Sequence, residues 1–243
     1  DLVRSRGLGD VYKRQDSAIV RLTETIAKIE ALYIADGHHR AASAVRVGEM
    51  RREATPGYTG EEEFNFFLAV LFSSDELAIM DYNRVVKDLN GYSFQSFYKE
   101  MKKRFDVTEI TDQKEKRPQE KGSFTMYMEG HWFLCKFRED DLAAVADDPV
   151  KSLDVSMLQD LLLHPVLGIG DPKTDGRIDF VGGIRGMDEL VRRCEEDCSV
   201  AFAMYPTSIT ELFSVADAGK LMPPKSTWFE PKLRSGLFIH SLE

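Results

Sequence analysis

The sequence predicts a mixed α/β or α+β domain, in which helices flank a mixed β-sheet. Three observations favour this class: the chain of 243 residues is long enough to bury a large core, 43% of it is hydrophobic, and short β-forming runs alternate with helical patterns. The formal net charge of −9 opposes broad electrostatic contact with nucleic acid or an anionic membrane, so neither is expected as a partner. No apolar run is long enough to predict a membrane span.

The first fifteen residues differ from the rest of the chain. Residues 1–15 have neither an apolar signal region nor a periodic pattern, and they resemble translated adaptor sequence, so they are set aside in predicting the fold. Residues 16–243 are expected to form one truncated α/β domain, with a sub-division near residues 106–122 left open. The odd cysteine count is typical of reduced thiols, which predicts a cytoplasmic protein.

The amino-terminal third predicts helices and buried strands in turn. Apolar residues at helical spacing predict an amphipathic helix over 16–31, and a β-forming run over 31–37 predicts a strand that ends in a turn and leads into a helix. Residues 64–74 have the continuous apolarity of a strand covered on both faces. Residues 76–89 predict one further strand, which ends before a turn at Asn90-Gly91.

The remainder alternates between strands and helices, with one antiparallel hairpin around Glu129-Gly130. Ser93 and Ser208 each precede a helical apolar stripe and are predicted to cap a helix. The expected elements in chain order are a helix after Ser93, hairpin strands over 123–128 and 131–137, a helix over 152–164 that stops before Pro165, a strand over 177–183, a helix from Met187, a strand over 199–206, a helix after Ser208 and an extended segment over 227–240.

The stretch "YIADGHHRAASA", residues 33–44, carries the strongest chemical pattern. Asp36-Gly37 predicts a turn, so His38, His39 and Arg40 fall on the first turn of the following helix. Free backbone N–H groups and the positive end of the helix dipole bind anions there, and two imidazoles and a guanidinium add donors suited to phosphate.

Other interpretations of this stretch stay open. The adjacent histidines could bind a metal, although neighbouring helical residues point about 100° apart and rarely chelate one ion. The stretch could also be a structural turn with solvated histidines. Asp36 is a candidate base or magnesium ligand, since phosphoryl transfer needs a carboxylate near the phosphate, and it is equally suited to stabilise the turn.

Three weaker patterns could also contact a ligand. Gly182 and Gly183 lie between a strand and a helix, and Arg185 follows them, which suits either an anion site or ordinary turn chemistry. Arg84 is a cation in a predicted strand, so it is either a ligand contact or a solvent-facing residue of an edge strand. Lys225, Ser226 and Thr227 follow two prolines, which suits contacts to phosphate or carboxylate but also a braced connector.

Five ordered motifs together carry a family resemblance. They are "YIADGHHRAASA", "YNRVVKDLNG", "LQDLLLHPVLGIGDP", "IDFVGGIRG" and "MPPKSTWFEPKLRSGLFIH". The chain from about residue 17 onward resembles the carboxy-terminal part of a bacterial family catalogued as domain of unknown function 1015, whose amino-terminal part is expected to be missing. Its Asp-Gly-His-His-Arg box is similar to the phosphate box of the ParB and sulfiredoxin superfamily, which includes free serine kinases, and Gly37, His39 and Arg40 match that box.

The resemblance implies a nucleotide-binding kinase that transfers phosphate to the hydroxyl of a small molecule such as free serine. It implies phosphate contacts from Gly37, His38, His39 and Arg40, with Asp36 and His39 as catalytic residues. ATP or ADP with Mg²⁺ is the expected cofactor, and Arg84, Lys225, Ser226 and Thr227 complete the predicted nucleotide contacts. The alternative is a regulatory module of ParB type that binds a nucleotide without catalysis.

Overall fold

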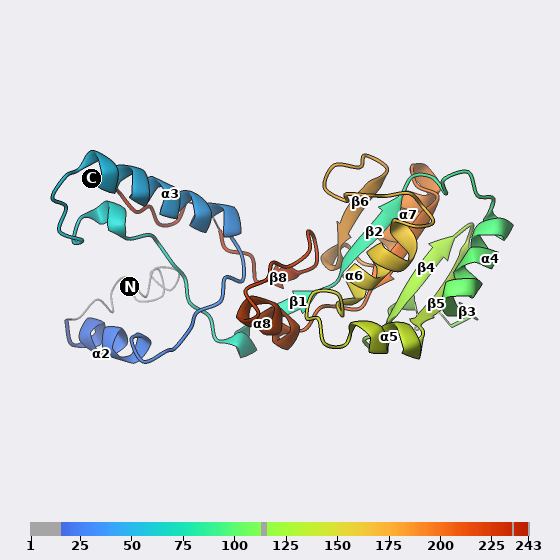
Figure 1. Ribbon diagram of the computed structural model, residues 1–243, viewed down its shortest axis with the longest axis horizontal. Coiled ribbons are helices and arrows are strands. Elements are labelled where there is room, and N and C mark those ends of the chain that lie inside the picture. The colour runs from blue at the N-terminus through green and yellow to red at the C-terminus, as the bar shows by residue number, and fades with distance from the viewer. Residues whose placement is uncertain (1–15, 113–115, 235, 243) are drawn as a thin grey trace, which may run out of the picture. The chain divides into compact units, whose positions relative to one another are not determined.

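The computed structural model describes residues 16–112, 116–234 and 236–242 (Figure 1). The expectation that residues 1–15 are adaptor-like therefore lies outside the described residues. The chain divides into two units, residues 1–41 and residues 42–243, and each is described by itself. Seven α-helices, one six-stranded sheet and one two-stranded sheet occur in the described parts, which confirms the mixed α/β class.

The larger unit is organised by the six-stranded sheet, which is antiparallel throughout (Figure 1). The strands lie in the order β3-β5-β4-β7-β2-β6, so β4 and β7 are central and β3 and β6 form the edges. Their bounds are Tyr82–Val86 for β2, Phe105–Ile110 for β3, Ser123–Met128 for β4, His131–Phe137 for β5, Ile178–Gly182 for β6 and Val200–Met204 for β7.

Each face of this sheet packs against its own layer of helices, because side chains of a strand alternate between the faces. On β7, Phe202 and Met204 belong to the larger core cluster, whereas Ala201 and Ala203 belong to the smaller one. The larger cluster also contains side chains of α4 (Phe94–Arg104), α6 (Asp154–Leu158) and α8 (Ile209–Asp217), and partly buried residues of α5 (Glu139–Val145) pack against it. On the opposite face, α7 (Met187–Glu196) packs against the smaller cluster.

Several local expectations are confirmed by the structure. Ser93 and Ser208 both form capping boxes, at α4 and α8 respectively. Glu129 and Gly130 both have positive φ, 47° and 85°, which is the two-residue turn that suits a β-hairpin between β4 and β5. The helix expected to stop before Pro165 runs as α6 and then as a π-helical stretch, Gln159–Leu163.

The single strand expected over 76–89 is in fact two strands in two sheets. β1 (Ala78–Met80) pairs antiparallel with β8 (Trp228–Glu230), whereas β2 joins the large sheet. Between them lies Asp81, which is 3% exposed and binds Arg117 and Asn83. This buried carboxylate lies where the chain passes from one sheet to the other.

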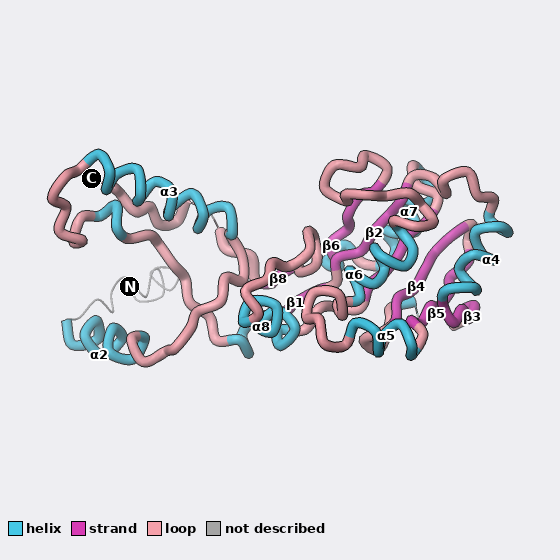
Figure 2. Tube along the Cα trace, in the orientation of Figure 1, coloured by secondary structure: helices cyan, strands magenta, loops and turns pink. Residues whose placement is uncertain are grey.

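Two expected strands are absent from the described residues, over 31–37 and 64–74, which Figure 2 draws as loop apart from the helical turns Glu63–Asn65 and Ser74–Glu76 at the two ends of the second segment. Continuous apolarity predicts burial, but a strand also needs a neighbour that pairs with its backbone. No described segment supplies that pairing. The large hydrophobic side chains between Phe66 and Phe72 are 40–56% exposed. The helix expected over 16–31 is also shorter, since α2 spans Asp16–Ile26.

Candidate functional site

The box predicted from the sequence lies at the start of α3 (His38–Ala54). Gly37 precedes the helix with φ +83°, a left-handed conformation that glycine adopts without strain. The Asp36 carboxylate accepts the Gly37 N–H at 2.8 Å and lies 4.0 Å from the Arg40 guanidinium. A turn followed by a helix is thus confirmed, although no strand of the described residues precedes it.

The side chains of this box are open to solvent. His38, His39 and Arg40 are all exposed, and the Arg40 side chain has 63% of its surface accessible. A Cβ atom on Gly37 would lie 3.0 Å from Arg40 Nε and Nη2, so the absence of a side chain leaves room for the guanidinium beside the turn. The first amides of a helix have no intrahelical acceptor, so this end presents N–H donors, imidazoles and a guanidinium together.

The second group of predicted residues gathers at β2 in the larger unit. Arg84 Nη2 donates to the Lys225 carbonyl at 3.1 Å, and the Lys225 ammonium lies 5.5 Å from the centre of the Tyr82 ring. Lys225 itself has φ +54°, a costly conformation for a residue with a side chain. The structure therefore brings Arg84 and Lys225 together at one turn.

Ser226 and Thr227 differ in their surroundings. Ser226 is 4% exposed, its hydroxyl donates to the Pro223 carbonyl at 2.8 Å, and its own carbonyl accepts the Thr207 hydroxyl at 3.1 Å. Thr227 is partly buried beside it. The Ser226 hydroxyl thus holds the shape of the turn, as expected of a braced connector.

Arg84 is not the solvent-facing residue of an edge strand that one interpretation proposed. It lies in β2, between β7 and β6, and is 4% exposed. Its guanidinium donates to the carbonyls of Tyr82 and Lys225 and lies 5.6 Å from the centre of the Phe180 ring. Burial lowers the pKa of Arg84 to about 9, which still leaves it cationic at neutral pH.

The two glycines at the carboxyl end of β6, Gly182 and Gly183, are explained by close packing. A Cβ on Gly182 would lie 2.5 Å from the Trp228 ring, and one on Gly183 would lie 2.7 Å from Asp81 Oδ2 and closer still to Oδ1. Arg185 is 66% exposed and lies 3.9 Å from Glu189. These contacts favour the structural interpretation of the two glycines over an anion site.

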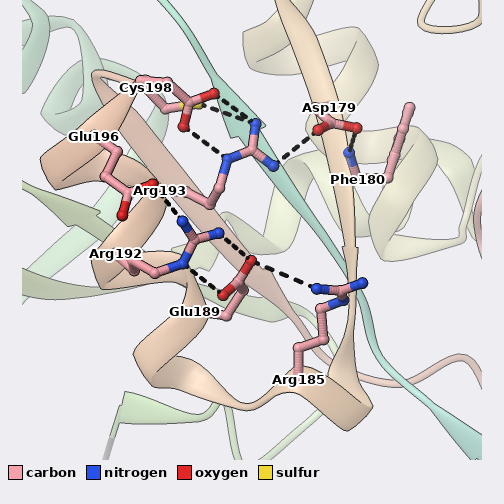
Figure 3. A network of polar contacts seen from close by, with 9 residues as sticks. Asp179, Phe180, Arg185, Glu189, Arg192, Arg193, Glu196 and Cys198 are labelled. Atoms are coloured by element: carbon pink, nitrogen blue, oxygen red, sulfur yellow. Dashed lines mark hydrogen bonds and ion pairs between the residues drawn. The ribbon is translucent and has the colours of Figure 1, made fainter.

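A charged cavity of about 360 Å³, which the sequence did not predict, lies between β6 and α7. Figure 3 shows the polar contacts between the side chains at this place. Arg193 binds Asp179 at 2.8 Å and Asp197 at 2.7 Å, and these bonds raise its pKa. Arg192 binds Glu189 and Glu196. Since each cation in this network already faces carboxylates, we interpret the network as structural. Its Arg193–Asp179 pair links α7 to β6.

The sequence also did not predict two buried carboxylates, those of Asp81 and Asp154. Asp81 accepts Arg117 Nη1 at 2.8 Å, a pairing across 36 positions. Asp154 is 6% exposed, and burial raises its pKa to about 7, opposed in part by the Gly122 N–H. Their burial is not marked by a local sequence signal, because Arg117 and Gly122 come from distant parts of the chain.

The described residues contain neither a cluster of metal-ligating side chains nor a membrane-spanning helix. No cluster of three or more His, Cys, Asp or Glu side chains there could hold a metal ion. No described helix combines the length and apolarity needed to cross a membrane.

The fold is that of a mixed α/β protein with exposed histidine and arginine side chains at the start of α3 and a buried arginine in its main sheet. The chain belongs to the family described as "Protein of unknown function (DUF1015)", which matches residues 7–156. The match thus begins ahead of residue 17, where the sequence resemblance was expected to start, and ends before the motifs that follow residue 156. No curated protein matches the chain.

Solved structures of free serine kinase are distantly similar. A mutant in complex with AMP has 18% sequence identity and a TM-score of 0.40, with 81% of this chain and 66% of that chain covered. A mutant in complex with ADP has 16% identity and a TM-score of 0.40 over the same shares. The chain therefore spans 66% of the length of these structures.

Proposed function

We propose that this protein binds the phosphates of ATP or ADP at the start of α3 and transfers phosphate to the hydroxyl of a small molecule such as free serine. The supporting observation is the geometry of the box. Gly37 turns the chain, and three exposed side chains, those of His38, His39 and Arg40, lie on the first helical turn. Amides at a helix start and charged donors are the groups that bind phosphate most strongly in proteins.

In this proposal each residue of the box has its own role. Arg40 and His38 hold phosphate oxygens, and Gly37 lets the backbone approach them. His39 donates to the transferred phosphate, where negative charge is spread over its oxygens. Asp36 orients the acceptor hydroxyl or accepts its proton.

Magnesium fits this box only together with the nucleotide. Mg²⁺ is commonly held by one or two carboxylates plus substrate phosphates, and Asp36 is the carboxylate present at the turn. When bound, the ion would neutralise charge on the phosphates. Arg84, Lys225, Ser226 and Thr227 lie in the larger unit, and the nucleotide contacts predicted for them from the sequence are not part of this proposal.

The Arg40→Ala variant tests the proposed phosphate site. We expect the affinity for ADP, measured by titration calorimetry with Mg²⁺, to fall roughly thirtyfold, or about 2 kcal/mol, the scale of a hydrogen bond to a charged group. Arg46→Ala is the matched control, because Arg46 is an exposed arginine nearly two turns further along the same helix. Equal losses in both variants, or no binding by the unaltered protein, would contradict the proposal.

Phosphoryl transfer is tested separately from binding. The protein is incubated with ATP, Mg²⁺ and a panel of hydroxylated amino acids, and phosphorylated product is measured by mass spectrometry. Product that depends on Arg40 and Asp36 supports the kinase. Nucleotide binding without product from any panel member would instead favour the regulatory module.

A further inference from the structure

A second cavity, of about 240 Å³, lies against the face of the large sheet that packs on α6. Its lining includes Arg84 and Phe180 of the sheet, Val155 and Leu163 of α6 and the π-helical stretch, and Pro223-Pro224 before the Lys225 turn. At about 30 Å³ per water molecule, this volume holds roughly eight waters. It is therefore sized for a small metabolite.

Arg84 brings an uncompensated positive charge to the wall of this cavity. Among the described residues its guanidinium forms no ion pair with a carboxylate, and it donates to the carbonyls of Tyr82 and Lys225. A guanidinium has five N–H donors, so three are without a partner in the described part of the chain. Burying a cation without a counter-charge is costly, and an anion in the cavity would offset that cost.

The other cavity walls indicate which kind of anion fits. Val155, Leu163, Ile178 and Phe180 are apolar, and Pro224 adds no N–H donor. At the exposed rim Lys151 and Asp160 carry opposite charges. One buried cation in an apolar setting matches a planar monoanion with a small apolar body better than it matches a phosphate dianion.

The backbone beside the cavity is irregular. Gln159 lines the cavity and begins the π-helical stretch Gln159–Leu163, and its side-chain amide donates to the Ile169 carbonyl at 2.8 Å. Short π-helical stretches within α-helices occur frequently at functional sites, because they shift side chains out of the regular helical register. This is a second, independent indication that the cavity binds a ligand.

We propose that this cavity binds a small organic carboxylate, with Arg84 as the residue that contacts the carboxylate group. This differs from the phosphate contact expected of Arg84 from the sequence. The proposal concerns the larger unit alone and does not depend on nucleotide binding at the start of α3.

Titration of the ¹⁵N-labelled full chain with lactate and propionate, followed by NMR without nucleotide, tests the proposal. We expect shifts in the amides of β2 and α6 and in the Arg84 Nε–H signal, and no such shifts with lactamide or propionamide, which have similar shapes without the charge. No shift around the cavity with either acid, or equal shifts with the amides, would overturn the proposal. Tighter binding of inorganic phosphate at these residues would overturn the choice of a carboxylate.

Two variants and one control locate the binding. Arg84→Met should weaken carboxylate binding at least about tenfold, whereas Arg192→Met, on α7 at the opposite face, should leave it unchanged. Ser156→Phe fills the cavity from α6 without altering Arg84, and it should also abolish binding. If circular dichroism shows that Arg84→Met does not fold, Ser156→Phe and the chemical-shift changes of the unaltered protein test the proposal instead. Unchanged binding by a folded Ser156→Phe variant overturns the proposal.

Discussion

Single residues at the start of β2 show how closely the chain is packed there. The Asp81 carboxylate accepts Asn83 Nδ2 at 2.5 Å and Arg117 Nη1 at 2.8 Å, and its carbonyl accepts the Gly183 N–H at 2.8 Å. Gly183 is buried against it and has no room for a methyl group. Position 183 therefore requires glycine because the Asp81 side chain leaves no room for a Cβ. Backbone conformation is not the reason, since the φ of Gly183 is not in the left-handed region.

Gly183→Ala tests this contact. A Cβ under 3.0 Å from the Asp81 carboxylate must displace a buried, hydrogen-bonded group, so we expect the free energy of unfolding to fall by about 1–3 kcal/mol in urea denaturation. Gly176→Ala is the control, since nothing lies within 4 Å of its Cβ and its φ is not positive. It should change stability by less than about 0.5 kcal/mol. Equal effects of both changes would show that the Asp81 contact is unimportant.

The same residues show how far sequence reasoning reaches at this scale. Ser93, Ser208 and the Asp36-Gly37 turn were predicted correctly, because a cap or a turn depends on residues within three positions. The burial of Arg84 and its contact with Lys225, 141 positions away, could not be predicted in this way. Whether a strand is interior or at an edge depends on pairing with distant segments.

At the scale of elements, α6 is linked to the start of β4 by a buried carboxylate. Asp154 is the first residue of α6, and the Gly122 N–H lies 3.1 and 3.0 Å from its two carboxylate oxygens. Burial raises the Asp154 pKa to about 7, with the nearby Glu211 adding to the rise and Lys121 opposing it. The junction between this helix and the sheet is therefore expected to respond to pH.

Asp154→Asn tests that response. The pKa of Asp154 in the folded state lies above the unfolded value of 3.8, so the folded protein favours the protonated carboxyl. Its contribution to the free energy of unfolding is fully present below about pH 4 and is lost as the pH rises towards 7. The unaltered protein should lose up to about 1.4 kcal/mol of unfolding free energy per pH unit in that window, relative to the variant. Denaturation curves between pH 4 and 8 measure the difference, and a pH-independent difference would contradict the raised pKa.

At the scale of the whole molecule, some apolar segments have their backbone hydrogen-bonded within a sheet and others do not. The central strands β4 and β7 are paired on both sides and buried on both faces. Residues 67–72 are equally apolar, yet none of their amides donates to a backbone carbonyl of the described residues, and their large side chains are exposed. Apolar segments of this chain thus occur both with backbone pairing, as in β4 and β7, and without it, as over residues 67–72.

Amide hydrogen exchange should separate these two kinds of backbone. Exchange of β4 and β7 requires opening of the sheet and should be the slowest in the chain, whereas the amides of residues 67–72 should exchange near the rate of an unprotected chain. Mass spectrometry of peptides after deuterium labelling measures both. Slow exchange over 67–72 would mean that this segment is paired in solution.

The sequence by itself determined the features that depend on neighbouring residues. These are the mixed α/β class, the helix caps at Ser93 and Ser208, the Glu129-Gly130 hairpin and the turn before His38. The tertiary structure alone decided which apolar runs become strands, why Gly183 must be a glycine, and that Arg84 is buried beside a cavity. The physical reason is that strand pairing and charge burial depend on contacts between distant positions, which local propensity and spacing do not specify.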